Sequence, residues 1–121
     1  MTSLIDTGVL LDYLSGLPEA KEALDRRPNS AISVLTWVEL LALAPDAKAE
    51  YTRNFLRRFE RLAINEAIAD RAAQVARAHP EVSLSFAVTY ATARINSLSL
   101  VTVDPPEAMR AEASIDVPYE R

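Results

Sequence analysis

Three acidic residues lie shortly after short apolar runs of the sequence. Asp6 directly follows the run at 4–5, and Asp104 directly follows the run at 100–103. Glu39 lies in the first turns of the helix that we expect after a second apolar strand. Loops and helix N-termini converge at the carboxyl ends of the strands in an open α/β sheet. We therefore expect these three carboxylates to meet at one edge of a sheet.

Carboxylates that crowd into one pocket repel one another, and a divalent cation relieves that repulsion. Hard oxygen ligands of this kind select Mg2+ or Mn2+ over zinc. Such a cation can activate a water molecule and stabilise the charge on a phosphodiester as it is displaced. Acids at strand ends also serve as helix caps or lie solvated in loops, so spacing alone leaves a structural role open.

The elements that must position these acids alternate along the chain. Short apolar runs predict buried strands at 4–5, 31–34, 100–103 and near 115–117. Helical spacing of apolar residues predicts helices over 7–14, 19–27, 37–44, 46–62, 65–78 and 84–96, with a short one ending near 113. This alternation indicates an α/β fold whose central sheet is mostly parallel and flanked by helices on both faces.

Composition limits the class of protein further. With 121 residues, half of them hydrophobic, the chain is long enough for one core, so we expect a single domain over 1–121. A net charge of -4 argues against a broad basic surface for nucleic acid. The absence of cysteine excludes a thiolate metal site and a disulfide framework. No apolar run approaches the roughly 20 residues that cross a bilayer, so we expect a cytoplasmic protein without membrane contact.

Three arginines recur every four residues within the predicted helix over 46–62. Arg53, Arg57 and Arg61 would form a stripe that could steer an RNA backbone or an acidic partner towards the crevice. A solvated helix face explains the same spacing. His79 is the only histidine and precedes a proline, which argues against metal-free RNA cleavage by a histidine pair.

Four segments resemble the motifs of PIN domains, and they occur in family order and at nearly family spacing. The first is Leu-Ile-Asp-Thr-Gly-Val-Leu at 4–10, and the second is Ile-Ser-Val-Leu-Thr-Trp-Val-Glu-Leu at 32–40. The third is Ala-Val-Thr-Tyr-Ala-Thr-Ala at 87–93, and the fourth is Leu-Val-Thr-Val-Asp at 100–104. The resemblance covers essentially the whole chain.

The resemblance implies a PIN-like three-layer sandwich and a metal-dependent endoribonuclease. Such enzymes are commonly VapC toxins of a toxin-antitoxin pair, held inactive by a partner protein and often dimeric. Carried over by position, Asp6, Glu39 and Asp104 would bind Mg2+ or Mn2+ and carry the hydrolysis of RNA, while Thr7 and Thr102 would support the site by hydrogen bonds. The expected partners are RNA, a cognate antitoxin and a second copy of the chain.

The chain departs from the family pattern at two positions. Gly8 stands where PIN domains usually have Asn, which removes a side-chain amide and can loosen a turn. Phe86 stands where the third motif normally begins with Asp, and no acid lies between 82 and 103 to replace it. Three acids could still hold one cation that keeps several waters. Phe86 also fits a domain that has lost catalysis and acts through protein contacts, an inactivating change, or a residue that completes an apolar patch.

Overall fold

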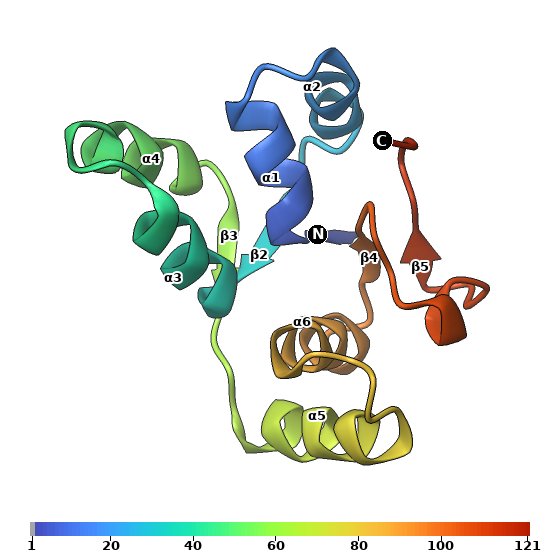
Figure 1. Cartoon of the computed structure of the whole chain (residues 1–121). Coiled ribbons are helices and arrows are strands. Elements are labelled where there is room, and N and C mark those ends of the chain that lie inside the picture. Colours follow the sequence, from blue (N-terminus) through green and yellow to red (C-terminus); the bar gives the residue numbers. More distant parts are fainter. Residues whose placement is uncertain (1) are drawn as a thin grey trace.

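A five-stranded sheet forms the centre of the computed structural model, which describes residues 2–121 (Figure 1). Its strands are β1 (Ser3–Ile5), β2 (Ser30–Ser33), β3 (Glu60–Leu62), β4 (Ser99–Val101) and β5 (Ile115–Asp116). Their spatial order is β3-β2-β1-β4-β5, and all four neighbouring pairs are parallel. From β1 the chain adds β2 and then β3 on one side of β1, and it then adds β4 and β5 on the other side of β1. The carboxyl end of β1 is therefore the switch point where α/β proteins build sites.

Helices cover both faces of this sheet. They are α1 (Thr7–Leu14), α2 (Pro18–Asp25), α3 (Val34–Leu43), α4 (Ala49–Leu56), α5 (Glu66–Ala78) and α6 (Leu84–Ile95), with short 3-10 turns at Asp46–Lys48 and Glu107–Met109. In Figure 1, α5 and α6 lie on one side of the strands, and α1 to α4 lie on the other.

The two faces of the sheet bury different residues because side chains alternate along a strand. Leu4 and Leu100 belong to the core cluster that includes the inward residues of α5 and α6. Ile5 and Val101, one position further along, belong to the cluster formed with α1, α3 and α4. Two cores separated by one sheet make a three-layer sandwich, which confirms the predicted fold class.

Side-chain caps fix where the helices nearest the sheet edge begin. Ser33 accepts a hydrogen bond from the backbone N–H of Leu35 at the start of α3, and Ser83 accepts one from Phe86 at the start of α6. Asp6 accepts one from the N–H of Thr7 at the start of α1. Since β1 and β2 pass into helices within a residue, the first turns of α1 and α3 are held at the carboxyl edge of the sheet.

The single helix predicted over 46–62 is wrong. After the turn at Asp46–Lys48, α4 ends at Leu56, and β3 follows as an edge strand that pairs only with β2. The side chains of Glu60 and Arg61 are exposed, so β3 lacks the apolar signature of a buried strand. Arg53 lies in α4, Arg57 is its C-cap and Arg61 lies in β3, so these arginines do not share one helix face.

Within residues 2–121, no helix has both the length and the apolar character needed to cross a membrane.

Candidate active site

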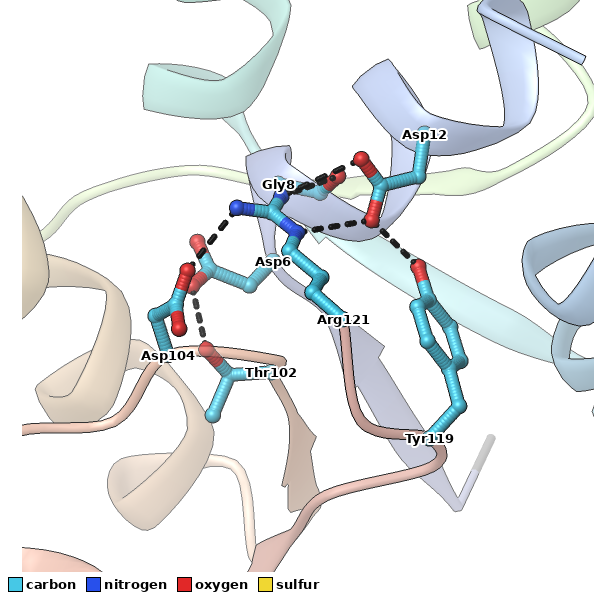
Figure 2. Close-up of polar contacts among 7 residues, drawn as sticks. All are labelled: Asp6, Gly8, Asp12, Thr102, Asp104, Tyr119 and Arg121. Atoms are coloured by element: carbon cyan, nitrogen blue, oxygen red, sulfur yellow. Dashed lines mark hydrogen bonds and ion pairs between the residues drawn. The ribbon is translucent and has the colours of Figure 1, made fainter. Parts of the chain in front are cut away.

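Asp6 is held between the two central strands by three hydrogen bonds. Its backbone N–H donates to the carbonyl of Val101 at 2.9 Å, which ties the end of β1 to β4. Its Oδ1 accepts from the N–H of Thr7 at 2.8 Å. Its Oδ2 accepts from the hydroxyl of Thr102 at 2.7 Å, as Figure 2 shows. The Asp6 carboxylate is thus fixed in orientation at the switch point of the sheet.

Glu39 reaches the same edge from the second turn of α3. Its Oε1 accepts a hydrogen bond from the hydroxyl of Thr7 at 2.7 Å, and its Oε2 accepts one from the hydroxyl of Ser85 at 2.9 Å. The buried hydroxyl of Thr36 lies 3.0 Å from that of Thr7. Thr7 therefore contacts Asp6 through its backbone and Glu39 through its side chain, so that one residue links the two acids.

Asp104 follows β4 and has a more exposed carboxylate. Its Oδ2 accepts from Nη1 of Arg121 at 2.8 Å, and 71% of its side chain remains exposed. Asp104 lines the same cleft as Asp6 and Glu39, and the volume of that cleft is about 400 Å³. The sheet edge thus gathers all three predicted acids around one hollow, with Thr7 in its wall.

The surroundings of Asp6 change the pKa of its carboxyl. Burial raises the pKa of the Asp6 carboxyl above its ordinary value, and the nearby Glu39 charge raises it further. The hydrogen bonds from Thr102 and the Thr7 N–H lower this pKa, as does the charge of Arg121. The net effect of all these influences is a pKa above the ordinary value. A cation placed beside Asp6 would favour its ionised form.

The donor chemistry of the cleft suits a hard cation, although the acids do not converge into a ready-made cage. In the described part of the chain, no three Asp, Glu, His or Cys side chains lie close enough together to form a metal cluster. Asp6 and Glu39 are linked through Thr7, whereas Asp104 is paired with Arg121. Carboxylate oxygens supplemented by waters are the ligands that Mg2+ accepts, so the residues present fit such an ion in character.

Phe86 forms part of the cleft wall from the first turn of α6. It is partly buried, packs against the core cluster beneath α6, and its ring stacks on that of Tyr90 at a centroid distance of 6.3 Å. The apolar role considered for Phe86 is therefore present, and α6 supplies no carboxylate to the cleft at this position.

The predicted arginines lie outside the acidic cleft. Arg53 and Arg57 form ion pairs with Glu50. The guanidinium of Arg61 lies over the ring of Trp37 at 4.4 Å. Arg57, Arg61 and Trp37 line a separate hollow together with Phe59.

Two residues that bond to the acids of the cleft could not be identified from the sequence motifs. Ser83 caps α6, whereas Ser85, two residues later, turns its hydroxyl to Glu39. Arg121 stands in no motif, and its ion pair with Asp104 depends on the path of the last residues past α1. The only feature of the sequence that points to Ser85 is its position two residues after the N-cap Ser83.

The family model of the PIN domain matches residues 3–106, and the chain belongs to this family. The resemblance stated from the four motifs is thereby confirmed.

Several solved structures share the fold of the whole chain. A toxin-antitoxin complex from Klebsiella pneumoniae is 32% identical over 99% of this chain and 100% of the matched chain, with a TM-score of 0.91. FitAcB from Neisseria gonorrhoeae is 25% identical over 97% and 98%, with a TM-score of 0.77. DNA-bound VapBC from Salmonella typhimurium is 20% identical over 96% of each chain, with a TM-score of 0.80. No curated protein matches the sequence. The chain is therefore similar over its full length to proteins solved in toxin-antitoxin assemblies.

Proposed function

We propose that this chain is the toxin of a toxin-antitoxin pair and cleaves RNA with one Mg2+ or Mn2+ held by Asp6, Glu39 and Asp104. The observation that carries the proposal is the cleft at the carboxyl edge of the sheet, which these three acids line and in which Thr7 joins two of them. Membership of the PIN family supports a nuclease, and the similarity to a toxin-antitoxin complex supports the biological role.

The residues of the cleft have separable tasks in this proposal. Thr102 and the Thr7 N–H orient Asp6, and the hydroxyls of Thr7 and Ser85 each occupy one oxygen of Glu39. These bonds leave the remaining lone pairs of both carboxylates available to a cation. When bound, the cation would supply an activated water and a positive charge for the phosphodiester. The open side of the cleft would admit an RNA backbone.

The proposed partners are an RNA substrate, a cognate antitoxin and a second copy of the chain, with the cytoplasm as the proposed location. Arg53, Arg57 and Arg61 are proposed as RNA or partner contacts. Arg57 and Arg61 line a hollow with Trp37, and guanidinium groups beside an indole ring suit the phosphates and bases of a single strand. This hollow is distinct from the acidic cleft. Substitution of Arg57 or Arg61 should therefore weaken RNA binding and leave cation binding unchanged.

Phe86 supports a second candidate function, a PIN scaffold that acts through protein contacts without catalysis. Its ring occupies the cleft wall where the family pattern places a fourth acid. With three carboxylates instead of four, the cleft attracts a cation less strongly. The two candidates therefore differ in whether the remaining acids suffice for cleavage.

RNA cleavage by the purified chain distinguishes these candidates. We expect Mn2+-dependent cleavage of a mixed RNA pool that chelator abolishes and that Glu39→Gln reduces by at least about tenfold. Glu66→Gln is the matched control, because Glu66 is an exposed acid on α5 that lies outside the cleft. An absence of cleavage in every RNA, together with stable binding of the antitoxin encoded beside the gene, would favour the scaffold.

A further inference from the structure

Arg121 brings a positive charge into the acidic edge of the molecule and is shared between two acids there. Its Nη1 donates to Oδ2 of Asp104 at 2.8 Å. Its Nε and Nη2 donate to the two carboxylate oxygens of Asp12 at 3.0 and 3.2 Å. Figure 2 shows the guanidinium lying between Asp12 and Asp104, close to Asp6. The group is a forked ion pair that spans from Asp12 on α1 to Asp104 in the loop after β4.

A second contact holds this arrangement in place. The hydroxyl of Tyr119 donates to Oδ2 of Asp12 at 2.7 Å, the same oxygen that accepts from Nε of Arg121. Burial, followed by this hydrogen bond, raises the pKa of the Tyr119 hydroxyl, so it stays protonated and continues to donate. Only 19% of the Asp12 side chain is exposed, against 43% for Arg121. Asp12 is therefore a fixed anchor on α1 for the segment that carries Arg121.

Gly8 provides the room for the guanidinium. A Cβ at position 8 would lie 3.2 Å from Nη2 of Arg121 and 3.4 Å from Cγ2 of Val103. Nη2 also faces the carbonyl of Gly8 at 3.4 Å. Any side chain at position 8 would press on the flexible end of Arg121. The absence of a side chain at Gly8, where the family pattern has Asn, therefore allows Arg121 to occupy its present position.

We infer that Arg121 is a built-in counter-ion that competes with the divalent cation for Asp104. The inference rests on the proposed function, because it concerns the same three acids. The Arg121 guanidinium is bonded directly to one proposed ligand, Asp104, and lies near a second, Asp6 (Figure 2). A positive charge at this distance opposes a divalent cation and satisfies part of the negative charge that would attract it. Occupation of the site then requires Asp104 to exchange its arginine for the cation.

A purely orienting arginine would have the opposite effect. If Arg121 served to aim Asp104 at the cation, its loss would leave that exposed carboxylate mobile and weaken binding. If Arg121 competes, its loss strengthens binding. The sign of the change in Mn2+ affinity therefore separates the two roles without any measurement of RNA cleavage.

Calorimetric titration with Mn2+ tests the inference on three variants of the full chain. Arg121→Gln keeps donors at this position and removes the charge, so its Mn2+ affinity should rise by about three- to tenfold. Arg121→Lys retains the charge and should stay within about twofold of wild type. Arg26→Gln removes one charge from an exposed pair on α2, outside the cleft, and should also stay near wild type.

Gly8→Ala provides a milder perturbation of the same contact. The added methyl group should shift the end of Arg121 by a few tenths of an ångström, so it should raise Mn2+ affinity less than Arg121→Gln does and should add little once Arg121→Gln is present. Unchanged or weaker binding by Arg121→Gln, while wild type still binds Mn2+, would overturn the inference and leave the proposed function intact. If none of the variants binds Mn2+, the inference and the proposed function fail together.

Discussion

The hydroxyl of Ser85 donates to Oε2 of Glu39 at 2.9 Å, although 46 residues separate them in the chain. This bond places the first turn of α6 against the acid carried by α3. The next residue, Phe86, lines the same cleft. Helix α6 thus contributes a hydroxyl and an aromatic ring where the family pattern has a carboxylate.

Phe86→Asp should restore a fourth carboxylate and raise both Mn2+ affinity and the rate of RNA cleavage. We expect the gain in affinity to reach about tenfold, because an added unit charge near a cation contributes on the order of 1 kcal/mol even at water-like dielectric. The same change should lower the free energy of unfolding by about 1–2 kcal/mol, since the ring packs on Tyr90 and the core beneath. Calorimetry and a cleavage assay measure the gain, and thermal unfolding measures the cost.

Phe86→Asn is the matched control for that gain. It removes the same ring without adding charge, so it should show the loss of stability alone. If Phe86→Asp binds no more Mn2+ than Phe86→Asn, position 86 does not face the cation.

Thr7→Val should lower Mn2+ affinity by about tenfold, because groups that orient metal ligands typically contribute between ten- and a hundredfold to affinity. The valine is close in size to threonine but cannot donate to Glu39, and the backbone bond from residue 7 to Asp6 remains. Thr7→Ser keeps the hydroxyl and should retain most of the affinity. Equal Mn2+ affinity in the Val and Ser variants would show that the hydroxyl does not support the site.

Asp6→Asn should stabilise the metal-free protein near neutral pH. Because the pKa of Asp6 is raised in the folded state, the folded protein binds the Asp6 proton more tightly than the unfolded chain does. The stability that this proton contributes is present at low pH and is lost as the pH rises through the folded-state pKa. The Asn side chain cannot ionise, so its melting temperature in chelator should exceed that of wild type at pH 7.

This difference should shrink as the pH falls from the raised pKa of Asp6 towards the ordinary pKa of an aspartate, about 3.9, and should be smallest below that value. Asp70→Asn is an exposed control on α5 and should show no such trend. A wild-type protein that melts higher than Asp6→Asn at pH 7 in chelator would contradict the expected cost of the Asp6 charge.

Most of the sandwich could be predicted from local patterns, because its buried strands and amphipathic helices each carry a recognisable period. Strand β3 could not be predicted in this way, because it lies at the edge of the sheet and exposes Glu60 and Arg61 to solvent. Its residues continue the apparent helical spacing of α4, and only the pairing with β2 makes them a strand. Pairing between distant segments cannot be recognised from the sequence of a few neighbouring residues.

The acids of the site followed from topology, since Asp6 and Asp104 directly follow predicted strands. Their partners were harder to find. Thr7 and Thr102 came from the family resemblance, and the bonds that they make to Glu39 and Asp6 agree with a supporting role. Arg121 could not be predicted, because its place depends on how the segment after β5 packs along α1.

Titration of Mn2+ into wild type, Asp6→Asn, Glu39→Gln and Asp104→Asn tests most directly whether the three carboxylates form one cation site. We predict that wild type binds one Mn2+ and that each substitution weakens binding by at least about tenfold, since each removes a charged ligand. Glu66→Gln, which removes an exposed acid outside the cleft, should bind as wild type does. Wild-type affinity in any of the three ligand variants would remove that residue from the site, and equal binding by all of them would contradict the account.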